Sequence, residues 1–192
     1  MSYPSAFRVA AVRALRPPCS PERRAYVIKI LSNTGMLPFC DPALLSLEEE
    51  LEIVREAAAD DPTLDLKLAR RFSSGAEEMP AEVALRVMDL LLAIANNNRV
   101  LPLIVKLLHD PNPQLRAKAV RLVARSNMAP KIAERLMTER DPRVRANAVE
   151  ALWGSGTPAT RGLLREATRD GNNRVAGNAL LGLYLLGEAG SI

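Results

Sequence analysis

Apolar residues recur along this chain at helical spacing, and prolines mark where many of the periodic runs begin. An Asp or Thr before such a proline can accept hydrogen bonds from free helix amides, while a proline at the first helical position loses no bond. Helix starts of this kind are predicted at Asp61-Pro62, Asp110-Pro111, Asp141-Pro142 and Thr157-Pro158. No stretch combines β-branched alternation with hairpin turns. The pattern predicts an all-α fold of about eleven short helices.

One helical segment recurs along the chain at intervals of about 30 residues. Residues 141–152 read Asp-Pro-Arg-Val-Arg-Ala-Asn-Ala-Val-Glu-Ala-Leu, with counterparts at 114–122 and 174–183 and a fainter copy at 83–91. Shorter helices are expected between the copies, at 100–108, 130–138 and 158–169. A helix–turn–helix unit of this period is typical of an α-solenoid.

These segments resemble HEAT-like repeats, in particular the phycobilisome-lyase type, whose inner helix reads Asp-Pro-x-Val-Arg-x-x-Ala-x-x-Ala-Leu. Residues 141–152 match every fixed position, and 110–123 match with a two-residue insertion. In the remaining copies Ala84 and Ala176 replace the motif arginine. The resemblance implies an α-α superhelix, or solenoid, of HEAT-like helical hairpins. The expected organisation is a divergent N-terminal helical cap at 1–79 and repeats at 80–192.

The resemblance also implies a structural role for the motif arginines, Arg116 and Arg145. In similar repeats this arginine pairs with an aspartate of a neighbouring repeat. Asp110 and Asp141 are therefore the candidate partners, and both are expected to cap helices as well.

Two rows of side chains are predicted on the concave face of the solenoid. With a step of about 100° per residue, Val144, Ala148 and Leu152 face the core, and Asn147 and Glu150 lie on the opposite, exposed side. Equivalent positions give a first row of Arg86, Lys118, Asn147 and Asn178, and a second row of Asp89, Arg121, Glu150 and Leu181. Solenoids commonly bind partners on such a surface. Because the rows mix amides with both charges, they suit a protein or peptide better than a phosphate backbone.

The outer helices carry a basic row that supports an alternative. Its members are Lys106, Lys131, Arg135, Arg161 and Arg165. Such a row could neutralise phosphates, which makes nucleic-acid binding through the basic C-terminal half the second hypothesis. The other interpretation is a solvated face, partly balanced by Glu134 and Glu166. The repeat subtype alone suggests a third function, a bilin-lyase-like chaperone for a cofactor-bearing partner.

Composition narrows the class of protein. The chain has 192 residues, of which 48% are hydrophobic and 25% charged, so it can bury a core without disulfides or metals. Its apolar runs are shorter than a bilayer requires, and no membrane partner is expected. Cys19 and Cys40 are too sparse for a disulfide scaffold, which indicates a reducing compartment and a cytoplasmic location.

Candidate catalytic chemistry is sparse. His109 is the single histidine, the cysteines have no CxxC spacing, and there is no glycine-rich phosphate loop. We therefore expect no catalytic residue, no metal site and no cofactor, and a non-enzymatic scaffold or adaptor for a protein or peptide. The final repeat helix is apolar nearly all round, with Leu180, Leu183, Leu185 and Leu186, which suggests end-to-end self-association or a longer array.

Overall fold

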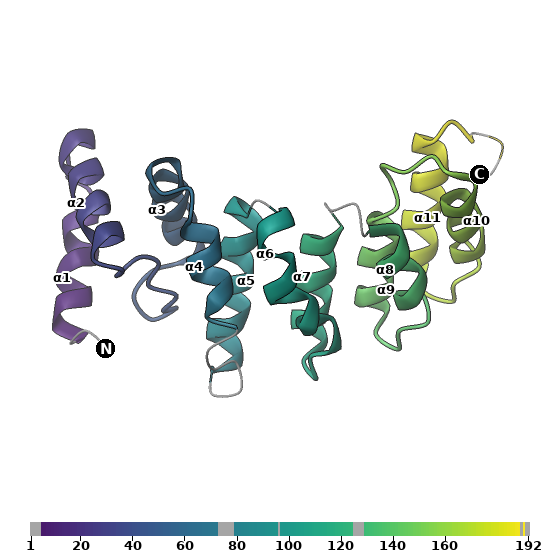
Figure 1. Ribbon diagram of the computed structural model, residues 1–192, viewed down its shortest axis with the longest axis horizontal. Helices are drawn as coiled ribbons and strands as arrows, with labels where there is room; N and C mark the ends of the chain where they lie inside the picture. The colour runs from purple at the N-terminus through teal and green to yellow at the C-terminus, as the bar shows by residue number, and fades with distance from the viewer. Residues whose placement is uncertain (1–4, 73–78, 96, 125–128, 189, 191–192) are drawn as a thin grey trace. The chain divides into compact units, whose positions relative to one another are not determined.

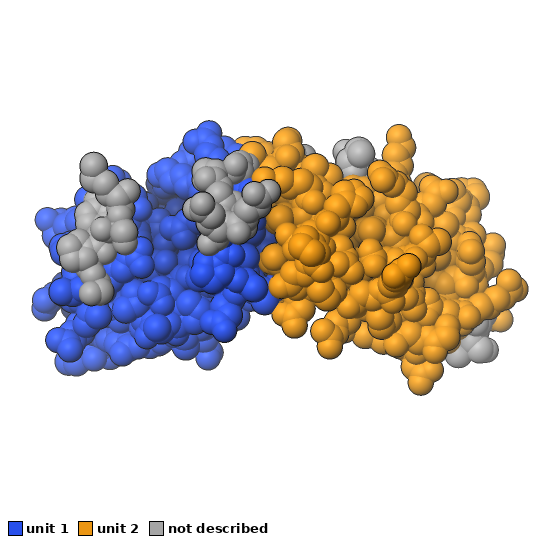
Figure 2. All heavy atoms as spheres, turned by 90° about the horizontal axis from the view of Figure 1, so that it is seen from below, with its two compact units in different colours: residues 1–96 blue, residues 97–192 orange. Residues whose placement is uncertain are grey.

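The computed structural model describes residues 5–72, 79–95, 97–124, 129–188 and 190. These residues form eleven α-helices and one 3₁₀ helix and contain no strand, which confirms the all-α prediction. The chain divides into two compact units, residues 1–96 and 97–192 (Figure 2). The two units are defined by the contacts that residues make within each of them. The expected division into a cap at 1–79 and repeats at 80–192 was based on the sequence pattern and stays a prediction.

The first unit is a series of five helices, each packed on its neighbours in chain order (Figure 1). Their bounds are α1 Ser5–Leu15, α2 Pro21–Asn33, α3 Leu47–Asp60, α4 Leu64–Arg70 and α5 Ala81–Ile94. The start of α3 has a capping box, in which Ser46 Oγ accepts from the Glu49 N–H and Glu49 Oε2 accepts from the Ser46 N–H. Helix α5 contacts both α3 and α4, so it closes the core of this unit.

A buried ion pair lies inside the first unit, between α3 and α5. Glu50 is fully buried and Arg86 is 7% exposed, and Arg86 Nε lies 3.1 Å from Glu50 Oε2. Glu50 Oε1 accepts from the Cys40 N–H at 2.6 Å, and Arg86 Nη2 donates to the Leu45 carbonyl. Burial raises the pKa of Glu50, although the Cys40 N–H and Arg86 oppose the shift. This cluster ties the non-helical segment between α2 and α3 to the helices behind it.

The second unit is a two-layered stack of helical hairpins. Its elements are α6 Asn97–Ile104, the 3₁₀ helix η1 Val105–His109, α7 Pro113–Val123, α8 Ala129–Leu136, α9 Pro142–Glu150, α10 Pro158–Ala167 and α11 Asn173–Leu185. The inner helices, α7, α9 and α11, contact one another in series, and η1, α8 and α10 each pack on the inner helix that follows. This serial stacking of hairpins is an α-solenoid (Figure 1).

Small side chains let the inner helices approach closely. Ala119, Ala148 and Ala179 are completely buried, whereas Ala151 is only half-buried. The predicted core positions Val144 and Leu152 are also completely buried. Replacing such a side chain by a larger one would force the stacked helices apart.

Two of the four predicted helix starts are correct and two are wrong. Asp141 and Thr157 cap α9 and α10 as expected. Asp61 and Asp110 accept from the N–H groups of Thr63 and Asn112, which precede the helix, so each closes a local turn there and caps no helix start. Helix α4 therefore begins only at Leu64 and α7 at Pro113.

The last two repeats pack through Trp153 and a glycine. Trp153 Nε1 donates to the Asn178 carbonyl at 2.9 Å, and the ring lies against Gly182 in α11. A Cβ at Gly182 would lie 2.7 Å from Trp153 Cδ1 and 3.1 Å from Leu164 Cδ2. Gly182 is therefore required by the close approach of the ring, since any side chain would displace a hydrogen-bonded tryptophan.

Two alanine substitutions in α11 should have opposite effects. Gly177→Ala meets no atom within 4 Å, so we expect a gain of about 0.5–1 kcal/mol from helix propensity. Gly182→Ala makes the same propensity gain but overpacks against Trp153, and we expect a net loss of about 1 kcal/mol. Urea unfolding followed by the fluorescence of Trp153, the single tryptophan of the chain, measures both. Equal changes in the free energy of unfolding for the two variants would contradict the role of Gly182 in packing against Trp153.

Candidate functional site

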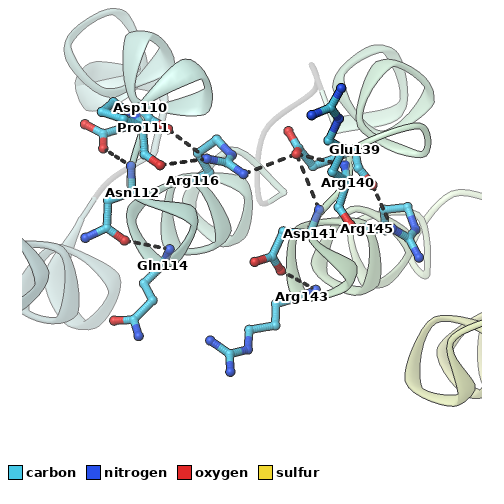
Figure 3. A network of polar contacts seen from close by, with 10 residues as sticks. All are labelled: Asp110, Pro111, Asn112, Gln114, Arg116, Glu139, Arg140, Asp141, Arg143 and Arg145. Atoms are coloured by element: carbon cyan, nitrogen blue, oxygen red, sulfur yellow. Dashed lines mark hydrogen bonds and ion pairs between the residues drawn. The ribbon is translucent and has the colours of Figure 1, made fainter.

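The motif arginines join successive repeats of the second unit, and Figure 3 shows the link made by Arg116. Arg116 Nη2 binds Glu139 at 3.2 Å, and its Nη1 donates to the Asp110 and Pro111 carbonyls. The expected inter-repeat pairing is present, but its partners were predicted wrongly. Arg116 contacts Asp110 only through the backbone, because the Asp110 carboxylate accepts from the Asn112 N–H.

Arg145 makes the stronger of the two links. Its Nε and Nη2 bind both carboxylate oxygens of Asp170 at 2.8 and 2.9 Å, and Nη1 donates to the Glu139 and Arg140 carbonyls. The Arg145 guanidinium holds the pKa of Asp170 below its ordinary value. Asp141, the other candidate partner, pairs with neither motif arginine, because its carboxylate caps its own helix α9 and accepts from the Arg143 N–H at 2.8 Å.

Two asparagines of the first predicted row form a second set of inter-repeat bonds. Asn147 Nδ2 donates to the Ala117 carbonyl at 2.9 Å, and Asn178 Nδ2 donates to the Ala146 carbonyl at 3.2 Å and to Glu150 at 2.8 Å. Each asparagine thus reaches the inner helix before its own. Asn147 is 6% exposed, so its expected exposure is wrong, because the amide is used to satisfy a buried carbonyl.

A groove of about 420 Å³ opens on the inner helices of the second unit. It is lined by Gln114, Ala117, Lys118 and Arg121 of α7, Arg143, Asn147 and Glu150 of α9, and Arg174 of α11. Four predicted row residues, Lys118, Arg121, Asn147 and Glu150, therefore come together in one place. Asn178 lies beside them through its hydrogen bond to Glu150.

Gln114, Arg143 and Arg174 form a third row that the sequence analysis missed. Each is the second residue of its inner helix, and their N–H groups are capped by Asn112, Asp141 and Asn172. Figure 3 shows the Gln114 and Arg143 side chains extending to the same side, away from the dashed network. The signal was present, because positions 143, 147 and 150 follow the spacing that keeps side chains on one helix face.

The remaining row residues do not line this groove. Arg86 and Asp89 belong to α5 in the first unit, and Arg86, expected to be exposed, is buried against Glu50. The Arg86 side chain therefore stabilises the core of its own unit. Leu181, expected in the second row, is 43% exposed on α11.

The basic row of the outer helices is partly neutralised. Arg161 and Arg165 both bind Glu188, at 2.8 Å each, rather than the expected balancing acids Glu134 and Glu166. These two arginines hold the pKa of Glu188 below its ordinary value. Lys106, Lys131 and Arg135 are exposed on η1 and α8.

No helix of the described ranges is both long enough and apolar enough to cross a bilayer. No group of three or more histidine, cysteine, aspartate or glutamate side chains is placed to hold a metal ion within the same ranges.

Two family models match segments of the second unit. Residues 129–192 match the family model for HEAT repeats, and residues 100–125 match that for a HEAT repeat. No curated protein matches the chain. Among solved structures, an engineered protein from the Northeast Structural Genomics Consortium is similar, with a TM-score of 0.56 and 16% identity over 94% of this chain and 96% of that chain. That likeness concerns the fold alone.

The residues that match the family models are the same residues that form the helical hairpins of the second unit. Residues 100–125 and 129–192 include α7, α9 and α11 together with the motif arginines that link them. HEAT repeats typically serve as scaffolds for protein interactions, through surfaces built from successive repeats. The second unit of this chain is a solenoid of HEAT repeats.

Proposed function

We propose that this protein is a non-enzymatic scaffold or adaptor that holds a protein or peptide partner in the groove of α7, α9 and α11. One observation carries the proposal: side chains at equivalent positions of successive repeats converge on a single groove. The motif arginines and Asn147 are already used to join the repeats. The exposed side chains of the groove, Gln114, Arg121 and Arg143 among them, are available to a partner.

Site-specific photo-crosslinking tests this function. A photoreactive amino acid replaces Gln114 in the groove or, as the matched control, Glu134 on the exposed side of α8. After irradiation in nuclease-treated native extract, we expect a discrete crosslinked protein from position 114 and none of the same mass from position 134. The same product from both positions, or no product from position 114, would contradict the proposal.

A further inference from the structure

We infer that the groove recognises an acidic peptide, an extended segment rich in aspartate and glutamate; this inference rests on the proposed function. The groove walls carry four cationic side chains, Lys118, Arg121, Arg143 and Arg174, and one carboxylate, Glu150. Within the described residues, the side chains of Arg121 and Arg143 have neither an ion-pair nor a hydrogen-bond partner. The surface therefore presents excess positive charge to whatever enters it.

The positions of Arg143 and Arg174 strengthen this assignment. Each is the second residue of a helix, where the positive end of the helix dipole disfavours a cation. No acidic residue occupies the first turn of α7, α9 or α11. Local helix stability alone would favour acids here. The N-cap Asp141 already supplies a carboxylate at the start of α9, whereas α11 is capped by the neutral Asn172. A carboxylate ligand that enters from outside therefore offsets the repulsion chiefly at Arg174.

The negative charge of Glu150 in the groove favours a peptide ligand over a nucleic acid. Its carboxylate lies among the cations, 3.9 Å from Arg174 Nη2, and accepts from Asn178 Nδ2. A phosphate backbone carries a charge at every nucleotide and would meet this carboxylate in any register. A peptide can place its acidic side chains on Arg121 and Arg143 and a backbone N–H or a neutral side chain next to Glu150. Gln114 adds an exposed amide that can bond to a peptide backbone.

Fluorescence anisotropy on the full chain tests the chemistry directly. The probes are fluorescein-labelled peptides of alternating Glu and Ser, Gln and Ser, or Lys and Ser, and a labelled oligothymidine. We expect the Glu/Ser peptide to bind best, and Arg121→Glu/Arg143→Glu to weaken it about tenfold or more. The matched control, Lys131→Glu/Arg135→Glu on α8, makes the same change in net charge outside the groove and should leave binding within about twofold. Circular dichroism checks that both variants stay folded.

Three outcomes would overturn the inference. Equal weakening by both double variants would show an effect of net charge alone. Tighter binding of oligothymidine than of the Glu/Ser peptide, lost in the groove variant, would assign the groove to nucleic acid. Absence of Glu/Ser binding would remove the acidic class. In that last case the crosslink from position 114 still decides whether the groove binds a protein, so the two proposals fail separately.

Discussion

Replacing Arg86 with methionine should lower the free energy of unfolding of the first unit by about 3 kcal/mol. The substitution leaves the Glu50 carboxylate buried without its ion-pair partner, with only the more weakly acting charge of Arg71 to oppose it. Arg86 Nε and Glu50 Oε2 have no hydrogen-bond partner within the described part of the chain, so this ion pair is what satisfies them. Urea unfolding followed by circular dichroism, together with hydrogen exchange at the amides of α3, measures the loss.

A double-mutant cycle separates the ion pair from the rest of the arginine side chain. Glu50→Gln/Arg86→Met removes both charges and should cost less than the sum of the two single variants. Arg23→Met, on the exposed side of α2, is the matched control and should stay within about 0.5 kcal/mol of the parent protein. Additive single effects would show that the two charges do not depend on each other.

Replacing Arg145 with methionine should destabilise the second unit by about 2 kcal/mol. The change removes a bidentate ion pair to the next repeat and two hydrogen bonds to carbonyls of the preceding turn. Arg145→Lys should recover only part of the loss, since lysine cannot bind both carboxylate oxygens of Asp170 in the same geometry. Trp153 fluorescence during urea unfolding reports the change.

Lowering the pH should remove the stabilisation that the ion pair between Arg145 and Asp170 provides. The folded pKa of Asp170 lies below its unfolded value of about 3.9, so its contribution is present above that pH and is lost as the pH falls through the folded pKa. The difference between parent and Arg145→Met should therefore narrow as the pH falls below about 4. Arg143→Met, two residues away on the same helix, is the control and should show little difference at any pH. A difference that stays constant in acid would mean that the ion pair contributes nothing.

Much of the second unit was predictable because its signals are local. Capping residues within a single segment predict that α9 starts at Pro142. Helical periodicity within single segments predicts that Val144 and Ala148 are buried and that inner and outer helices alternate. The convergence of Lys118, Arg121, Asn147 and Glu150 was also implied by equal spacing along repeated helices. The late starts of α4 and α7 were missed, because an aspartate can close a turn before a helix as well as cap one.

Partners across repeats could not be predicted in the same way. The resemblance to HEAT-like repeats made Asp110 and Asp141 the candidate partners of the motif arginines, while the structure brings Glu139 and Asp170 to them. The two aspartates lie near the start of their own helices, where free N–H groups compete for their carboxylates. Only the stacking of one hairpin on the next decides which acid lies within reach.

The sequence by itself determined the helical class, the repeat period and four of the residues that line the groove, since these follow from helical periodicity and from the similarity of successive segments. Tertiary structure alone decided which polar side chains stay exposed. Arg86 and Asn147 occupy equivalent positions in the repeat pattern, yet one pairs with Glu50 and the other with the Ala117 carbonyl. Each of these polar side chains can be buried only because a segment distant in the sequence supplies its hydrogen-bond or ion-pair partner. Helical periodicity cannot predict which segment that is.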